Sequence, residues 1–318
     1  MSFPDYSIVV PVYLNESTVE DVVSRIESIS SHLGVNTQAI FIIDGSPDRS
    51  EELLRDSLQK SDISNYKIIS LSRNFGAWTA VRAGLAASDG NVTATMAADL
   101  QEPMELYLDF YTTLQSSKDA QIAIGVRKER DDPLAQRIFA NLFWYLYRVI
   151  VNRSIPRGGV DVFALTKVSL VQLNRYTESG TSVIGLLYEI GFDKVHCVYS
   201  RSERLAGKSA WTLRKRINYL LDSVIAFSDF PLRVIVFLGT FSTLVFTAAG
   251  LVLIVGRLTD SIVVPGYTSL MLAIFFVGSV IVMSLGVIGS VIWRTYLGSK
   301  NRPNWIVKQE LIVDKKAK

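Results

Sequence analysis

The chain has 318 residues, of which 49% are hydrophobic and 20% charged, and its formal net charge is +3. This length suits one large domain with an appendage. The small net charge and the lack of a basic face with interleaved aromatic residues argue against nucleic acid as a partner. The single cysteine, Cys197, excludes an internal disulfide, and two histidines without a cysteine cluster argue against a zinc site.

Short apolar runs alternate with helical patterns in the first half of the chain. The runs that predict strands lie at 7–12, 39–43, 66–71, 91–96 and 121–125. The patterns that predict helices lie at 19–33, 50–58, 77–87 and 106–114. Strands that alternate with helices indicate an α/β fold with a doubly wound, mainly parallel sheet.

Carboxylates follow two of these predicted strands. Asp44 comes after the second strand and Asp99 after the fourth, so both should lie at the same edge of a parallel sheet. Asp99 and Gln101 offer hard oxygens of the kind that Mg²⁺ or Mn²⁺ prefers. Alternatively, Asp99 only caps a helix that begins near Pro103. The chain has no GxGxxG or GxxxxGK[ST] motif, which argues against a dinucleotide site or a P-loop.

Three features beyond residue 125 each leave two interpretations open. The predicted aromatic helix at 134–151 could be a core helix or could lie against lipid. Asp161, at the entry to a predicted strand, could orient an acceptor or act as a base, or could form only an Asx-turn. The basic loop at 200–209 could be a solvated loop, or could act at a membrane face because a membrane-seeking segment follows it.

The C-terminal third predicts membrane attachment. An amphipathic helix is expected at 213–227, in the plane of the lipid headgroups. The stretches 234–255 and 267–293 carry no charged residue, and each is long enough to cross a bilayer. Cations flank the outer ends of this pair, and the N-terminus carries no signal peptide pattern. We therefore expect a multi-pass protein of the inner (plasma) membrane with its N-terminal domain and both termini in the cytoplasm.

Taken together, these segments resemble the dolichol-phosphate-mannose-synthase-like glycosyltransferases, and most closely the bacterial polyprenyl-phosphate (bactoprenol) glucosyltransferases with two C-terminal membrane helices. The likeness covers nearly the whole chain. The motifs that carry it are Val10-Pro11-Val12-Tyr13 with Asn15-Glu16, Asp44-Gly45-Ser46-Pro47-Asp48, Ser72-Arg73-Asn74-Phe75-Gly76, Asp99-Leu100-Gln101-Glu102-Pro103, Gly125-Val126-Arg127, Arg204-x-x-Gly207-Lys208-Ser209 and Arg302-Pro303.

The resemblance implies a GT-A fold and an inverting transfer of a sugar from a nucleoside diphosphate to a polyprenyl phosphate. We expect UDP-glucose as the donor, undecaprenyl phosphate as the acceptor and Mg²⁺ or Mn²⁺ as the cofactor. The expected donor-binding residues are Pro11, Tyr13, Glu16, Asp44, Ser46, Asn74 and Arg204. The expected acceptor-phosphate residues are Arg127, Arg137, Arg201 and Lys208. Asp99 and Gln101 are the expected metal ligands, and Asp99 and Asp161 the expected catalytic residues.

The implied organisation has four parts. They are a GT-A domain at 1–210, an interfacial helix region at 211–231, a transmembrane hairpin at 232–298 and a basic tail at 299–318. The sequence leaves a homo-oligomer open.

Three positions depart from the family pattern. Ile43 and Ala97 each replace an aspartate, and Leu14 is inserted between the usual tyrosine and asparagine. The metal would therefore have one fewer carboxylate. The departures keep a non-catalytic, membrane-anchored nucleotide-sugar sensor open, and a GDP-mannose-dependent mannosyltransferase is the nearest enzymatic alternative. A processive polysaccharide synthase is less favoured, because the chain lacks a Gln-x-x-Arg-Trp motif and further spans.

Overall fold

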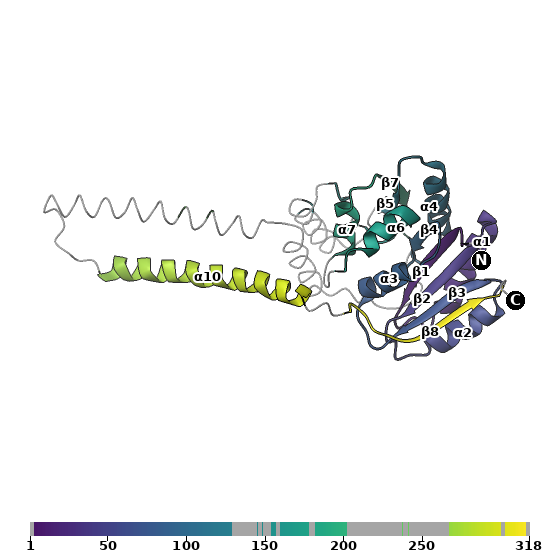
Figure 1. Cartoon of the computed structure of the whole chain (residues 1–318), viewed down its shortest axis with the longest axis horizontal. Helices are drawn as coiled ribbons and strands as arrows, with labels where there is room; N and C mark the ends of the chain where they lie inside the picture. The colour runs from purple at the N-terminus through teal and green to yellow at the C-terminus, as the bar shows by residue number, and fades with distance from the viewer. Residues whose placement is uncertain are drawn as a thin grey trace. The chain divides into compact units, whose positions relative to one another are not determined.

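The computed structural model describes residues 3–128, 145, 148, 154–156, 160–177, 182–201, 237, 241, 267–299 and 303–315. The chain divides into two compact units, one formed by 1–220 with 303–318 and the other by 221–302. Figure 1 labels their helices and strands.

The described part of the first unit contains an eight-stranded sheet with the order β7-β5-β6-β4-β1-β2-β3-β8. The strands are β1 Tyr6–Val12, β2 Thr37–Ile43, β3 Asn65–Leu71, β4 Val92–Thr95, β5 Ile122–Arg127, β6 Phe163–Thr166, β7 Lys194–Tyr199 and β8 Val307–Asp314. β1 pairs in parallel with β2 and β4, and β2 pairs in parallel with β3. β6 and β8 run antiparallel to their neighbours. The prediction of a mainly parallel, doubly wound sheet is confirmed.

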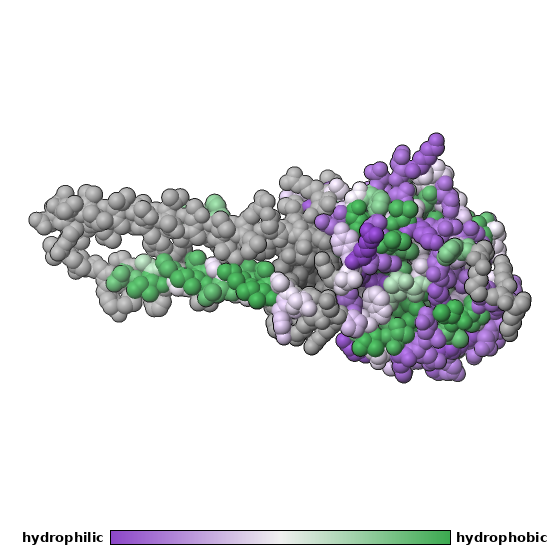
Figure 2. Space-filling model, in the orientation of Figure 1, coloured by the Kyte–Doolittle hydropathy of each residue, from purple (hydrophilic) through white to green (hydrophobic). Residues whose placement is uncertain are grey.

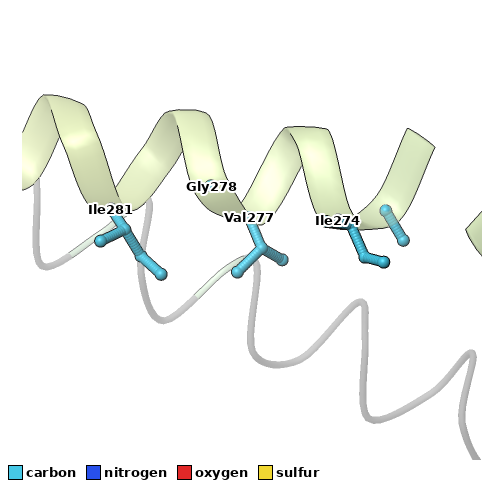
Figure 3. A pocket seen from close by; sticks show the side chains of 5 residues that line it. Ile274, Val277, Gly278 and Ile281 are labelled. Carbon is cyan, nitrogen blue, oxygen red and sulfur yellow. The ribbon is translucent and has the colours of Figure 1, made fainter. Parts of the chain in front are cut away.

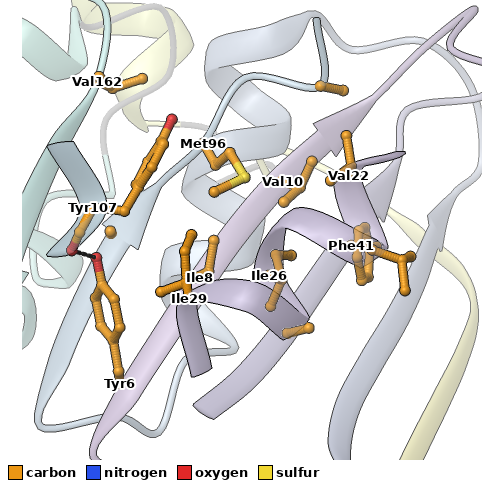
Figure 4. Close-up of a cluster of buried hydrophobic side chains, with 14 of the residues drawn as sticks. Tyr6, Ile8, Val10, Val22, Ile26, Ile29, Phe41, Met96, Tyr107 and Val162 are labelled. Atoms are coloured by element: carbon orange, nitrogen blue, oxygen red, sulfur yellow. Dashed lines mark hydrogen bonds between the residues drawn. The ribbon is translucent and has the colours of Figure 1, made fainter. Parts of the chain in front are cut away.

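Helices cover both faces of the sheet. They are α1 Val19–Leu33, α2 Ser50–Lys60, α3 Ala77–Ala86, α4 Met104–Ser116, α6 Lys167–Asn174 and α7 Val183–Glu189. α1, α2 and α4 share one hydrophobic core with alternate residues of β1 and β2. Figure 4 shows part of it, where Ile8 and Val10 of β1 lie against Val22 and Ile26 of α1. Because side chains alternate along a strand, the intervening residues of β1 face the opposite side.

α3 packs on that opposite side, and a glycine permits the close approach. A Cβ added at Gly84 would lie 2.2 Å from Cγ1 of Val9 and 3.2 Å from Cγ1 of Ile42. Val9 and Ile42 are both fully buried. The small residues of α3 therefore serve a tight contact between this helix and the middle of β1 and β2.

The described part of the second unit is dominated by α10, Tyr267–Ser299. Hydrophobic side chains run along it (Figure 2), and Ile274, Val277 and Ile281 line a shallow groove on one side (Figure 3). Among the described residues, no helix is both long enough and apolar enough to cross a membrane. The two predicted spans stay predictions, and 234–255 lies outside the described residues except for Phe237 and Phe241.

Several elements of the first unit were not predicted. They are β7, β8, α6 and α7. β8 lies within the tail expected at 299–318, yet it pairs with β3 along its whole length. The tail thus completes the sheet of the first unit. The predicted helices at 134–151 and 213–227 lie outside the described residues, apart from Tyr145 and Arg148, which are both helical.

Candidate functional site

The predicted site residues that the structure describes gather at the carboxyl-end edge of the parallel strands. The register aligns Val12, the last residue of β1, with Ile43, the last of β2, and Ile43 with Ser70 of β3. β5 and β7 end together at Arg127 and Tyr199. The loops that follow these strands therefore emerge at one edge, which is where α/β sheets bind ligands.

Asp44 ties two of these loops together. It is only 2% exposed, and its carboxylate accepts hydrogen bonds from the backbone N–H groups of Phe75 at 2.7 Å and Gly76 at 2.8 Å. Gly45 follows it with φ +62°, and an added Cβ there would lie 2.4 Å from the carbonyl carbon of Arg73. Asp44 and Gly45 thus fix the loop that starts α3, a structural role that the sequence did not predict. Nucleoside binding by Asp44 stays a prediction.

A second polar network joins the loops after β1 and β2. Ser46 Oγ accepts the backbone N–H of Leu14 at 2.8 Å, and Asp48 accepts the backbone N–H of Glu16 at 3.2 Å. Burial raises the pKa of Asp48, but hydrogen bonds from Ser46, Ser50 and Glu16 lower it, and the net shift is downward. Leu14 has φ +57°, a strained conformation for leucine that this network holds. The inserted residue is thereby accommodated without breaking the loop.

The other described residues that were predicted to bind the sugar donor are more accessible to solvent. Tyr13 is 41% exposed, Glu16 and Asn74 are exposed, and Pro11 is half-buried in β1. Glu16 accepts the backbone N–H of Arg49 at 3.3 Å. The exposed side chains can reach a ligand from the solvent side, whereas Asp44 is buried.

Asp99 lies in the loop between β4 and α4. Its Oδ2 is 3.7 Å from a terminal nitrogen of Arg201, which follows β7. Leu100, next along the chain, has φ +54° and turns the backbone sharply before the buried Gln101. The N-cap of α4 is Pro103. The interpretation of Asp99 as the capping residue of that helix is therefore wrong.

Glu102 is the most buried acidic side chain of this loop. It is 1% exposed, and neither carboxyl oxygen has a hydrogen-bond partner. Its pKa is raised from 4.5 to about 7, chiefly by burial and then by the negative charge of Asp99, with Asp161 adding to the rise and Arg201 opposing it. Glu102 belongs to the motif Asp99-Leu100-Gln101-Glu102-Pro103, but the sequence analysis predicted no role for it. Its burial, which decides its chemistry, has no signal in the sequence.

Arg127, the last residue of β5, forms an ion pair with Asp161, which precedes β6. Tyr199 donates a hydrogen bond from its hydroxyl to Asp161 Oδ2 at 3.4 Å. Burial alone would lower the pKa of Arg127, but the charge of Asp161 and contact with Tyr199 outweigh it, so the pKa is raised. Tyr199 is a further residue that the sequence analysis missed, because β7 was not predicted.

The structure thus brings together four predicted residues from four segments, namely Asp99, Arg127, Asp161 and Arg201. Arg201 contacts Asp99, and Arg127 contacts Asp161. The electrostatic influence of Asp99, Arg201 and Asp161 on Glu102 links the two pairs. Arg137, Arg204 and Lys208 lie outside the described residues.

A divalent cation fits this site only with help from a ligand. Among the described residues no group of three or more His, Cys, Asp or Glu side chains could hold a metal ion. Mg²⁺ and Mn²⁺ are commonly held by one or two carboxylates and complete their shells with substrate phosphates. The oxygens of Asp99 and Gln101 suit that arrangement.

Comparison with known proteins finds relatives that are similar over nearly the whole chain. The chain is 31% identical to an uncharacterized glycosyltransferase of Synechocystis sp., over 95% of this chain and 94% of that protein. It is 30% identical to the bactoprenol glucosyl transferase of Shigella phage SfV, over 96% of this chain and 98% of that protein.

Among solved structures, glucosyl-3-phosphoglycerate synthase from Mycobacterium tuberculosis superposes with a TM-score of 0.49 at 18% identity, covering 70% of this chain and 80% of that chain. The profile of glycosyl transferase family 2 matches residues 7–172. That match covers more than half of the chain and includes β1 to β6 of a GT-A-like fold. The chain belongs to glycosyl transferase family 2.

Proposed function

We propose that this glycosyltransferase is a membrane-bound, inverting enzyme that moves glucose from UDP-glucose to undecaprenyl phosphate and yields a polyprenyl-phosphate sugar. The observation that carries the proposal is the meeting of Asp99, Arg201, Arg127 and Asp161 at one sheet edge. Transfer of a sugar from a nucleoside diphosphate to a polyprenyl phosphate requires a carboxylate that can bind a metal ion and cationic side chains that can bind phosphate groups. The bactoprenol glucosyl transferases, similar over nearly the full chain, support the choice of sugar and acceptor.

We assign the donor to the part of the site that is formed by the loops after β1, β2 and β3. The exposed residues Tyr13, Glu16 and Asn74 take the nucleoside, while Asp44 and Ser46 keep these loops in place. Asp99 and Gln101 would hold Mg²⁺ or Mn²⁺ beside the donor diphosphate. Such an ion neutralises the charge of the departing diphosphate.

The acceptor needs positioning more than activation. A phosphomonoester has a second pKa near ~6, so it is largely a dianion at neutral pH and is already a nucleophile. Arg127 and Arg201 are assigned to its oxygens, because guanidinium groups bind phosphate in a defined orientation. Holding the acceptor behind the anomeric carbon removes much of the entropic barrier. We assign to Asp161 the orientation of Arg127, and with it of the acceptor phosphate.

Membrane attachment is part of the proposal because the acceptor's tail stays in the bilayer. Two charge-free stretches of the sequence, 234–255 and 267–293, support it. The described side chains of α10 include exposed apolar residues along its length, such as Leu270, Ile281 and Ile292. The flanking cations favour cytoplasmic termini and a cytoplasmic catalytic domain. In a Cys197→Ser background, Thr259→Cys should react with an impermeant thiol reagent added outside and Lys316→Cys should not. The reverse labelling would contradict the orientation.

A donor screen tests the chemistry. Purified full-length chain is incubated with undecaprenyl phosphate and each of several radiolabelled UDP- and GDP-sugars, with Mg²⁺ or Mn²⁺. We expect label from UDP-glucose to enter the lipid phase and chelation to stop it. Transfer from GDP-mannose alone would replace the proposed donor. Binding of nucleotide sugars without any transfer would support a sensor instead.

A further inference from the structure

Glu102 is a buried carboxyl group that the fold itself does not explain. Its backbone oxygen accepts a hydrogen bond from Arg25 at 3.0 Å, which fixes the main chain. Its two side-chain oxygens are buried without any hydrogen-bond partner. Burying a polar group without a partner costs free energy, and a carboxylate costs more than a neutral group. A buried acid of this kind therefore points to a ligand that completes its surroundings.

Other buried polar atoms near Glu102 also lack partners. The hydroxyl of Tyr107 is buried without a hydrogen bond, and so are the Nε atoms of Arg127 and Arg201. In Figure 4 the ring of Tyr107 extends away from Tyr6 and toward Val162, the neighbour of Asp161. Burial, and then the negative charge of Glu102, raises the pKa of the Tyr107 hydroxyl. Of the groups that bear these atoms, Arg201 acts electrostatically on Glu102, and Glu102 acts on Tyr107.

Two other acids act electrostatically on Glu102. The negative charges of Asp99 and then of Asp161 disfavour the ionised form of the buried Glu102 carboxyl, and a bound cation would offset that effect. Arg201 contributes opposite charge, and one of its terminal nitrogens lies 3.7 Å from Asp99 Oδ2. Between Asp99 and the buried Glu102, Leu100 adopts the left-handed backbone conformation with φ +54°. A strained turn next to a buried, unpaired acid is typical of a functional site.

We propose that Glu102 is a second carboxylate ligand, with Asp99, of the divalent cation that accompanies the donor diphosphate. This inference rests on the proposed function. Two carboxylates and the diphosphate oxygens match the oxygen ligands that Mg²⁺ and Mn²⁺ take when bound with a nucleotide. Arg201 supplies positive charge at Asp99 while the cation is absent.

The test measures Mn²⁺ binding to the full-length protein in detergent in the presence of UDP, by the loss of the electron paramagnetic resonance signal of free Mn²⁺. Glu102→Gln should weaken Mn²⁺ binding by about tenfold or more, since even residues behind the ligands contribute that much. Glu105→Gln, an exposed acid in the first turn of α4, is the matched control and should bind as wild type. Equal Mn²⁺ affinity in Glu102→Gln and wild type would overturn the proposal.

Glu102→Asp provides a second variant that keeps the charge but withdraws it by one methylene. It should bind Mn²⁺ more weakly than wild type and more tightly than Glu102→Gln, and wild-type affinity would again count against the proposal. The assay also separates the two claims. If wild type binds no Mn²⁺ with UDP, the proposed donor site fails. If wild type and Glu102→Gln bind equally well, only the role of Glu102 fails.

Discussion

Arg127, the last residue of β5, forms an ion pair with Asp161, which precedes the antiparallel strand β6. Because β5 and β6 are adjacent and run in opposite directions, the end of one meets the start of the other. Tyr199 holds the same carboxylate from β7. Asp161 therefore fixes the direction of the guanidinium that we assign to the acceptor phosphate.

Asp161→Asn should lower the transfer rate by about a hundredfold or more, because misplacing a phosphate clamp is costly even when the group remains. The KM for polyprenyl phosphate should rise, and the KM for the donor should change little. Asp193→Asn, an exposed aspartate just before β7, is the control. A donor KM that rises as much as the acceptor KM would contradict an acceptor-side role for Asp161.

Asp44 and Asp99 should respond differently to truncation. Asp44→Ala removes two hydrogen bonds to backbone N–H groups in a buried position, and bonds to charged groups contribute about 1.5–3 kcal/mol each. We expect a clear fall in the thermal midpoint. Asp99→Ala, at a half-buried loop position, should leave the midpoint within a few degrees of wild type. Thermal unfolding of both variants in detergent checks this, and equal losses would refute the division into structural and functional carboxylates.

Arg204 lies outside the described residues, so its role is tested by substitution alone. We expect Arg204→Lys to lower turnover markedly, because lysine does not reproduce the two-point grip of arginine on phosphate. Membrane insertion and thermal stability should be unchanged. If the loop at 200–209 is attracted only to anionic lipid, each cation contributes about 1 kcal/mol and lysine serves as well. Measuring the turnover of Arg204→Lys and Arg204→Ala side by side distinguishes these two roles. Turnover of Arg204→Lys at the wild-type rate would rule out specific binding of phosphate by Arg204.

The buried acid Glu102 predicts a pH dependence of stability in metal-free solution. Its pKa is about 7 in the folded protein against 4.5 for an exposed glutamate, so the folded state holds the proton more tightly. Stability is therefore lost as the pH rises from about 4.5 to about 7, by about 3 kcal/mol in total. Glu102→Gln cannot ionise and should gain thermal stability relative to wild type over that interval. A difference in midpoint that does not vary with pH would show that Glu102 is not buried and unpaired.

The edge of the sheet was predictable because its signals are local. Apolar runs that end at Asp44 and near Asp99 mark the carboxyl ends of strands, and parallel pairing then brings them to one edge. The ion pairs of the site could not be predicted from such local signals. Asp161 and Arg201 reach Arg127 and Asp99 only through the pairing of β5 with β6 and β7, which depends on the tertiary fold.

Two features could not be predicted because burial and long-range pairing decide them. β8 contains Lys308, Glu310 and Asp314, so its sequence resembles a solvated tail, and only pairing with β3, far away in the chain, makes it a strand. Glu102 follows Gln101 in a loop, where an acid is normally exposed. Its side chain is nevertheless buried in the folded chain, two residues after the left-handed turn at Leu100.

The central claim is most directly tested by following label from radiolabelled UDP-glucose into the organic phase with undecaprenyl phosphate, for wild type, Asp99→Ala and the Glu105→Gln control. We predict metal-dependent transfer by wild type and by Glu105→Gln, and transfer reduced to background by Asp99→Ala although that protein is folded. Transfer by Asp99→Ala at the wild-type rate with saturating Mg²⁺ or Mn²⁺ would contradict the account.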